Sequence, residues 1–290
     1  MQIVQRDDVP LVRGLEYRGG TFHSQVVLRG IEGSLGNFQL SLGQTGGDFF
    51  SPRHRHNFEQ FRVQLEGTLD FARDGKMKPG MVGYFPEGVR YGPQSQDPDE
   101  KPLTAVLQFG GASGSGYLSN RQVRAGTEAL KAYGTFKDGV FRRNEGVEGR
   151  RNTDAYQAIW EHVHGEPMRY PEGRYDKPVF MDSAHFAWVP VAGAAGVEDK
   201  LLGVFTERRS LARFVRIRAG RQYQLEGRGV FLAISGAGRV GDQPLRACTS
   251  IALEAGEQVR LSADEETVLV HLGLPDLADL EAGLHAEAAE

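Results

Sequence analysis

The stretch Ser51–Gly67, SPRHRHNFEQFRVQLEG, decides the fold of this chain. It places His54 and His56 two residues apart, follows them with Glu59 and Gln60, and ends a β-patterned run at a glycine. Side chains at positions i and i+2 of an extended strand point to the same face, so the two imidazoles can converge on one point. Such imidazole pairs are common ligands of divalent transition metals. The stretch therefore predicts a metal site inside a β structure.

Length and composition limit the class of protein. The chain has 290 residues, 40% apolar and 25% charged, which is typical of a soluble globular protein with one large or two ordinary domains. A net charge of −4 and the absence of a long basic run argue against nucleic acid as a partner. No apolar stretch reaches the roughly 20 residues that cross a bilayer, and the first residues lack the plan of a secretion signal. We expect a cytoplasmic protein with no membrane partner.

The cysteine content narrows the choice of metal ligands. Cys248 is the only cysteine, so neither an intrachain disulfide nor a thiolate cluster can form. Any metal ion must therefore be held by nitrogen and oxygen ligands.

Short runs of Val, Leu, Ile, Phe and Tyr alternate with glycine-rich turns along the chain. This pattern is typical of a β-sandwich or a β-barrel. In the first half we expect strands at 24–28, 36–42, 60–65, 82–85 and 103–109. In the second half we expect strands at 200–205, 212–218, 229–234, 250–253 and 267–272.

The segment between these two sets of strands has a helical pattern. Helices are predicted at 120–133 and 153–164, the second capped by Asn152 or Thr153 and stopped by Gly165. The predicted domains are an N-terminal barrel at 1–112, a helical and irregular bridge at 113–178, a second barrel at 179–275, and a helix or tail at 276–290.

A weak internal repeat supports two copies of one barrel. The run FRVQLEGTLDF, which turns at Gly67, has a counterpart in GVFLAISGAGRV, which turns at Gly236. A second glycine follows each turn at nearly the same interval, Gly88 in the first half and Gly256 in the second. The identity between the copies is low, so the evidence lies in the spacing.

These residues resemble the cupin superfamily, and their duplication resembles a bicupin. The first cupin motif runs glycine, five or six residues, H-x-H, three or four residues, Glu, six residues and Gly. Here Gly47, the two histidines and Gly67 take the matching places. The resemblance implies an all-β fold of two double-stranded β-helix (jelly-roll) barrels joined by a helical bridge.

The second cupin motif, G-x5-P-x-G-x2-H-x3-N, is also present with one departure. Gly80, Pro86 and Gly88 match it, but Tyr91 stands where the histidine belongs. A phenol can bind a metal as phenolate, or it can donate a hydrogen bond or transfer a proton. We therefore expect Tyr91 to act either as a ligand or as a catalytic group.

The first motif also departs from the family at its carboxylate. Counted by spacing, Gln60 occupies the place of the usual glutamate, whereas Glu59 lies one residue out of register. A one-residue shift on a strand moves a side chain to the opposite face. In the Gln60 register Arg62 and Gln64 point inward. The spacing on both sides favours Gln60, and Glu59 remains the alternative.

The second barrel lacks the ligands. Transfer of the spacing places Tyr223, Leu225, Gly229 and Val259 at the positions of His54, His56, Gln60 and Tyr91. None of these residues can reproduce the site, so we expect the second barrel to be structural.

The resemblance implies a metal-dependent enzyme that acts on a small organic molecule, most often a dioxygenase-type oxidoreductase. The alternatives are a non-redox isomerase or decarboxylase and a non-catalytic ligand-binding cupin. The expected cofactor is one divalent transition metal: iron, manganese, nickel, copper or zinc. A homodimer is expected. The predicted metal ligands are His54, His56, Gln60 and Tyr91, with Tyr91 also catalytic, and the predicted substrate-binding residues are Arg62, Gln64 and Gln94.

Overall fold

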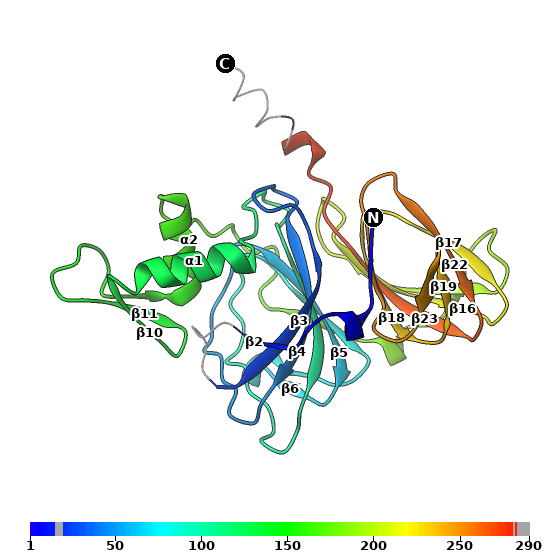
Figure 1. The fold of residues 1–290 in the computed structure, drawn as a ribbon, viewed down its shortest axis with the longest axis horizontal. Helices are drawn as coiled ribbons and strands as arrows, with labels where there is room; N and C mark the ends of the chain where they lie inside the picture. The colour runs from blue at the N-terminus through cyan, green and yellow to red at the C-terminus, as the bar shows by residue number, and fades with distance from the viewer. Residues whose placement is uncertain (15–19, 281, 283–290) are drawn as a thin grey trace.

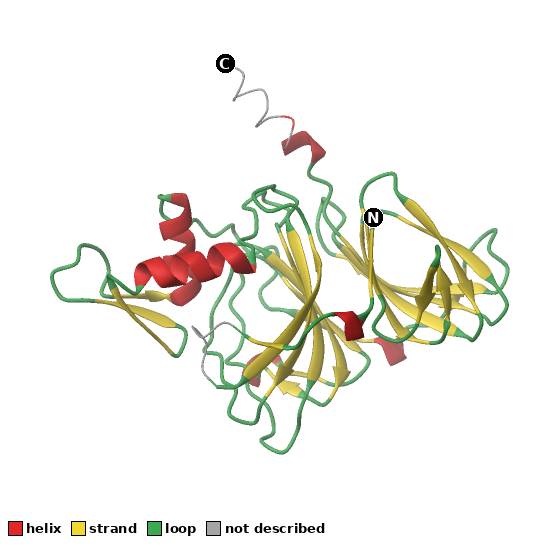
Figure 2. Cartoon of the chain, viewed as in Figure 1, coloured by secondary structure: helices red, strands yellow, loops and turns green. Residues whose placement is uncertain are grey.

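Two β-barrels lie side by side, and a helical lobe packs against the outer end of the first (Figure 1). The computed structural model describes residues 1–14, 20–280 and 282. Strands dominate both barrels, and the longer helices are confined to the lobe (Figure 2). The described helices are all too short or too polar to cross a membrane. The predicted all-β fold with a helical bridge is confirmed.

The main sheet of the first barrel has seven strands in the order β13-β8-β5-β9-β4-β3-β2. Its strands are β2 (Val12–Arg13), β3 (Phe22–Arg29), β4 (Phe38–Thr45), β5 (Glu59–Glu66), β8 (Met81–Phe85), β9 (Leu103–Phe109) and β13 (Val179–Asp182). Opposite this sheet lie the short strands β6 (Leu69–Asp70) and β7 (Lys76–Met77) and several isolated β-bridges.

The main sheet of the second barrel also has seven strands, in the order β1-β21-β18-β23-β16-β15-β14. They are β1 (Gln2–Val4), β14 (Val189–Pro190), β15 (Val197–Val204), β16 (Leu211–Ile217), β18 (Gly229–Ser235), β21 (Ser250–Leu253) and β23 (Thr267–Gly273). A four-stranded sheet faces it, formed by β17 (Gln222–Glu226), β22 (Gln258–Ala263), β19 (Gly238–Val240) and β20 (Gln243–Leu245).

The two halves repeat one topology down to its irregularities. The order β8-β5-β9-β4-β3 in one sheet corresponds to β21-β18-β23-β16-β15 in the other. The pairing of β5 with β9 is interrupted between Gln64 and Glu66, and the pairing of β18 with β23 is interrupted at the corresponding place, between Ala233 and Ser235. A bulge found at the same place in both sheets is a shared feature of the architecture and not a local defect. The predicted duplication is therefore present.

Each main sheet takes an outer strand from beyond its own half of the chain. β1, at the start of the chain, pairs with β21 of the second barrel. β13, which immediately precedes the second barrel, pairs with β8 of the first. The predicted domain limits at 112 and 179 do not include this exchange, which ties the two barrels together through backbone hydrogen bonds.

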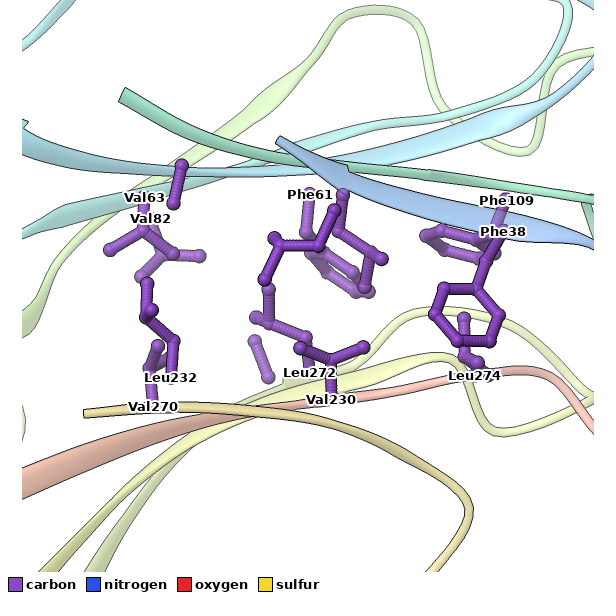
Figure 3. Packing of buried hydrophobic residues seen from close by; sticks show 14 of the residues in the cluster. Phe38, Phe61, Val63, Val82, Phe109, Val230, Leu232, Val270, Leu272 and Leu274 are labelled. Carbon is purple, nitrogen blue, oxygen red and sulfur yellow. The ribbon is translucent and has the colours of Figure 1, made fainter. Parts of the chain in front are cut away.

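A large apolar core lies between the two main sheets rather than inside a barrel. Phe61 and Val63 of β5 face Leu232, Val270 and Leu272 of the second sheet across this core (Figure 3). Because side chains alternate along a strand, the other face of β5 is turned to the interior of the first barrel. The first barrel can therefore leave its interior polar while its main sheet remains well packed.

The interior of the second barrel is a separate apolar core. Leu225, Phe231 and Val259 are among the buried side chains that fill it. Two of the four residues predicted to replace the metal ligands, Leu225 and Val259, thus pack in this core. His271 stacks on Phe231 with ring centroids 4.0 Å apart, and burial lowers its pKa to about 3. A neutral imidazole held this way is a core residue.

The helical lobe contains more β structure than predicted. Its helices are α1 (Asn120–Leu130) and α2 (Ala155–His164), and its small sheet comprises β10 (Gly134–Lys137), β11 (Val140–Arg143) and β12 (Asn152–Asp154). The prediction that Asn152 or Thr153 caps α2 is wrong because both residues lie earlier on β12 and do not adjoin Ala155, the first residue of the helix. Asp154 is the N-cap instead, and its carboxylate accepts from two backbone N–H groups.

In the described part of the chain, three 3₁₀ turns and the start of the tail complete the fold. The turns are η1 (Arg6–Asp8), η2 (Ala72–Asp74) and η3 (Ser183–His185). Of the helix predicted in the tail, residues 278–280 are helical, and residues 281 and 283–290 lie outside the described part of the chain.

Candidate functional site

The two cupin-like motifs meet as neighbouring extended segments. His54 and Tyr91 form an isolated antiparallel bridge, with backbone N–O distances of 3.1 and 2.9 Å. One step further, the Gly88 N–H donates to the His56 carbonyl at 2.8 Å. Gly88 has a φ of +76°, and a Cβ there would collide with the Pro171 carbonyl oxygen, so only glycine fits. This glycine lets the two segments pair where their side chains enter the barrel.

Four predicted site residues, the two histidines among them, converge on one atom, the hydroxyl oxygen of Tyr91. His54 Nε2 and His56 Nε2 each lie 3.0 Å from it. His54 Nδ1 lies 2.6 Å from the Pro52 carbonyl, which can only accept a hydrogen bond, so Nδ1 carries the proton. The Nε2 lone pair of His54 therefore points to Tyr91. Fixing the imidazole tautomer through a backbone carbonyl is how proteins orient metal-binding histidines.

Gln60 faces the same point, but with its amide nitrogen. Its Nε2 donates to the Tyr91 hydroxyl at 2.9 Å. Its Oε1 accepts from Arg62 at 3.2 Å and from Gln108 at 3.4 Å. The strand thus has the register in which Gln60 and Arg62 face the interior, while the alternate residues, such as Phe61, pack against the second barrel.

Arg62 holds a positive charge inside the barrel, next to the histidine pair. It donates to Gln94 Oε1 at 2.7 Å and to the Tyr91 hydroxyl at 3.2 Å, and its guanidinium lies 4.5 Å from the centre of the Phe85 ring. Of the predicted substrate-binding residues, the structure brings Arg62 and Gln94 together at the cavity. Gln64 is instead occupied by the Thr104 hydroxyl and the Glu66 carbonyl, and it does not line the cavity.

Glu59, the alternative ligand, lies on the opposite face of β5. Its carboxylate accepts from the Ala112 N–H at 3.1 Å and from the Ser210 hydroxyl of the second half at 2.8 Å. Burial and, next, the negative charge of Glu87 raise the pKa of Glu59 to about 7. Arg174 binds Glu87 at 2.6 Å. These groups form a buried ionisable cluster between the barrels, separate from the histidine pair.

The site opens into a cavity of about 250 Å³. Its floor is the polar face of the main sheet together with the histidine pair. Its mouth is partly covered by the lobe, from which α1 supplies Val123 and Arg124 and α2 supplies Tyr156. Phe58 lies between floor and lobe and stacks on His56, with ring centroids 4.3 Å apart. The lobe thus encloses the site on the side away from the second barrel.

The donors fit a first-row divalent ion through His54, His56 and Tyr91. Two ligands about 2.1 Å from one ion, at about a right angle, lie about 3.0 Å apart, and each imidazole nitrogen lies 3.0 Å from the phenol oxygen. In the described part of the chain no three His, Cys, Asp or Glu side chains gather as a metal site, so a third protein ligand would have to be of another residue type, and the Tyr91 oxygen lies within 3.0 Å of both imidazole nitrogens. Gln60 fits less well, because turning its oxygen inward would set its NH₂ group against the Arg62 guanidinium.

Several contributors to the site carry no sequence signal. Gln108, on the neighbouring strand β9, donates to Gln60 and accepts from the Tyr117 hydroxyl at 2.9 Å. Tyr117 and Tyr156 come from the lobe, far along the chain from the motifs. Their alternation with apolar residues matches ordinary packing, so only the fold shows that they line a cavity.

No family model matches the sequence, and neither does any curated protein. Solved structures do match. A proposed dioxygenase from Nostoc punctiforme is similar with a TM-score of 0.64 and 12% identity, over 94% of this chain and 82% of that one. The chain has the bicupin fold.

Two further bicupins have the same arrangement. Oxalate decarboxylase from Bacillus subtilis, in a form with one serine replaced by alanine, is similar with a TM-score of 0.54 and 12% identity, over 95% of this chain and 78% of its own. A proposed glyoxylate-induced protein from Pseudomonas aeruginosa is similar with a TM-score of 0.55 and 12% identity, over 90% of this chain and 83% of its own. Similarity at this level of identity establishes the bicupin fold and leaves the reaction to be argued from the site.

Proposed function

We propose that the first barrel holds one divalent first-row transition metal through His54, His56 and Tyr91 and acts as a metal-dependent enzyme on a small organic molecule. The proposed reaction is a dioxygenase-type oxidation. The observation that carries the proposal is the convergence of both imidazole Nε2 atoms on the Tyr91 hydroxyl at 3.0 Å, on the floor of a cavity whose mouth the lobe partly covers.

A bound ion of this kind would supply Lewis acidity and, if it is redox-active, electron transfer. The residues of the chain provide the rest. His54 is held in one tautomer by the Pro52 carbonyl, and Gln60 and Arg62 both donate to the Tyr91 oxygen. These contacts fix the Tyr91 oxygen beside the two imidazoles, where it is placed to bind the ion. The lobe covers part of the mouth above the floor.

The solved structures similar to this chain support the proposed metal and leave the reaction open. One is a proposed dioxygenase and another is a decarboxylase, so both reaction classes occur on this fold. The Bacillus subtilis decarboxylase is described with Mn(II) centres. Decarboxylation or isomerisation is our second candidate, because a phenol within reach of two imidazoles can also move a proton without oxidation.

Metal analysis tests the site. Protein purified without chelators should contain close to one equivalent of a first-row metal, and the His54→Ala, His56→Ala double variant should lose it. The matched control is the double variant His162→Ala, His164→Ala, which removes a second H-x-H pair. That pair lies on α2, where residues two apart point in different directions. Equal metal in the wild type and the His54/His56 variant would refute the proposal.

Oxygen dependence separates the two reaction classes. A dioxygenase-type reaction consumes oxygen in proportion to product and stops under nitrogen. A decarboxylase or isomerase reaction continues without oxygen and tolerates a redox-inert ion such as zinc. A protein that retains a ligand but turns over no substrate with any added metal would contradict both reactions and favour the ligand-binding alternative.

The homodimer expected from the resemblance stays a prediction. Light scattering of the purified protein would measure its mass against the 31.9 kDa of one chain. A mass close to that of two chains is the expected result.

A further inference from the structure

The charged side chains among the described residues that line the cavity of the first barrel are all arginines. Arg62 contributes a cation at the floor, and Arg29 and Arg124 contribute cations nearer the surface. Among the described lining residues there is no Asp or Glu. The chain as a whole carries a net charge of −4, so this lining differs in sign from the rest of the molecule. A concave surface of one charge concentrates ligands of the opposite charge.

Arg62 is rigidly placed for recognition. It is 8% exposed, its two terminal nitrogens donate to Gln94, Gln60 and Tyr91, and its guanidinium lies over Phe85. A planar guanidinium fixed in this way loses little conformational entropy when it binds a carboxylate. The same guanidinium is 3.2 Å from the hydroxyl on which both histidines converge. An anion bound to it would therefore lie next to the proposed metal site.

Part of the lining beside Arg62 is apolar. Val106 is its cross-strand partner on β9, and both residues line the cavity. Phe58, Leu118 and Val123 continue the apolar surface toward the lobe. A ligand whose charged group contacts Arg62 would place the rest of its body against these side chains. At about 250 Å³ the cavity lies below the roughly 300–1,000 Å³ typical of drug-sized ligands.

We propose that the substrate of the first barrel is a small organic carboxylate with an apolar or aromatic body. Arg62 binds the carboxylate, the wall formed by Val106 and Phe58 packs against the body, and Arg124 at the mouth draws the anion inward. This proposal rests on the proposed function, because it names the substrate class of the same site.

The test compares acids with their neutral amides of the same shape. Benzoate is compared with benzamide, and phenylacetate with phenylacetamide. Each compound is titrated calorimetrically into the full-length protein, first as purified and then after a chelator has removed any metal. We expect at least one acid to bind about tenfold or more tightly than its amide in both preparations, as hydrogen bonds to a charged group require. Arg62→Gln should bring that ratio close to one, and Arg62→Lys should retain part of it.

A rim variant tests the steering without touching the floor. Arg124→Glu should slow acid association several-fold and weaken its dependence on salt. The control is Lys131→Glu at the end of the same helix, outside the cavity lining, which should change neither. If each amide bound the wild-type protein as tightly as its acid, this result alone would overturn the proposal. An acid preference that survives Arg62→Gln in a protein with an unchanged melting curve would also overturn it.

The two proposals fail separately. An acid preference retained in the His54→Ala, His56→Ala variant, with no metal bound in the wild type, refutes the proposed function and supports the carboxylate site. Metal bound as predicted, with no acid preference in metal-free protein, refutes the carboxylate site and leaves the metal proposal intact.

Discussion

The two barrels share strand order and bulges but differ in the side chains that face their interiors. Arg62 and Phe231 each lie two residues before the bulge of their strand, and the first is a cation lining a cavity whereas the second is a core side chain. Their neighbours differ in the same way. Thr104 pairs with Gln64 at the first bulge, and Leu269 pairs with Ala233 at the second. One architecture thus supports a polar hollow and a solid apolar interior.

The position of the main core explains how the first barrel tolerates its hollow. Its main sheet is held by apolar packing against the second barrel, on the face away from the cavity. The inward face can therefore carry groups chosen for chemistry. The second barrel contributes stability through both faces of its sheet, which is consistent with a structural role.

The sharpest test of this contrast is truncation at the equivalent inward positions. Phe231→Ala should lower the free energy of unfolding by about 3–5 kcal/mol, because it leaves a void in a closed apolar core. Arg62→Ala should lower it by clearly less, because Arg62 borders a space that already exists. Urea denaturation of both variants measures the difference. Equal losses would show that the two interiors are equivalent in stability.

The buried carboxylates between the barrels should give the protein a pH-dependent stability. The pKa of Glu59 is raised from its ordinary value of 4.5 to about 7, so the folded state holds a proton that the unfolded state releases. The stabilisation is fully present below pH 4.5 and is lost as the pH rises to about 7. A shift of this size corresponds to about 3 kcal/mol.

Glu59→Gln should remove this pH dependence. The amide can still accept from Ala112 and can donate to Ser210. Above pH 7 the variant should be more stable than the wild type, as followed by thermal unfolding. The control is Glu226→Gln, which removes an exposed carboxylate from β17. The pKa of Glu59 is about 7, so the comparison runs from pH 4.5 to about one unit above that value. If the melting temperatures of the wild type and of Glu59→Gln changed in parallel over this range, Glu59 would not be the source of the pH dependence.

A smaller effect on stability is expected when buried polar side chains of the first barrel are replaced by apolar ones, as in the second barrel. The Thr104 hydroxyl donates to Gln64 Oε1 at 2.9 Å, and both side chains are buried. Thr104→Val should lower the free energy of unfolding by about 1–3 kcal/mol, because it leaves a buried carbonyl oxygen without its donor. Adding Gln64→Leu should recover much of this loss, as measured by urea denaturation. A double variant no more stable than the single one would show that the pair is not coupled.

The smallest expected effect concerns the lobe, which supplies part of the cavity lining of the first barrel. The Asp154 carboxylate caps α2 by accepting from Tyr156 N and Gln157 N. Asp154→Ala should cost about 1 kcal/mol of stability, measured in urea, and Asp154→Asn should cost less. Because Tyr156 lines the cavity, Asp154→Ala should also weaken ligand binding. Unchanged binding would show that α2 does not shape the site.

Alternation and motif spacing were enough to predict the strands and the inward register of β5. Each of the ten predicted strands overlaps an observed one, and Leu103–Phe109 and Ser250–Leu253 agree at both ends. The proximity of His54 and Tyr91 also follows from the pairing of two motifs. The predicted roles of these residues in binding metal and substrate remain predictions.

Other features depended on contacts that no local pattern encodes. The exchange of β1 and β13 is set by which sheet edges lie nearby, and both strands are too short for their alternation to be distinctive. The Glu59 cluster joins Glu87, Arg174 and Ser210, which are distant in sequence. Arg62 and Gln108 donate hydrogen bonds to Gln60 Oε1, so the amide nitrogen of Gln60 is the atom that faces the site. These hydrogen bonds can be seen only once the fold is known.

The exchanged strands have a practical consequence for anyone cutting the gene. A fragment that stops before residue 179 loses β13, the outermost strand of its main sheet, and a fragment that starts at residue 179 lacks β1. Each fragment alone would expose an unpaired sheet edge and the large apolar face that packs between the two main sheets. The two fragments should aggregate when produced separately and recover as a soluble pair when produced together. Splitting the chain in the exposed 144–150 loop would make such a pair, a reconstitution system in which each half reports on the other.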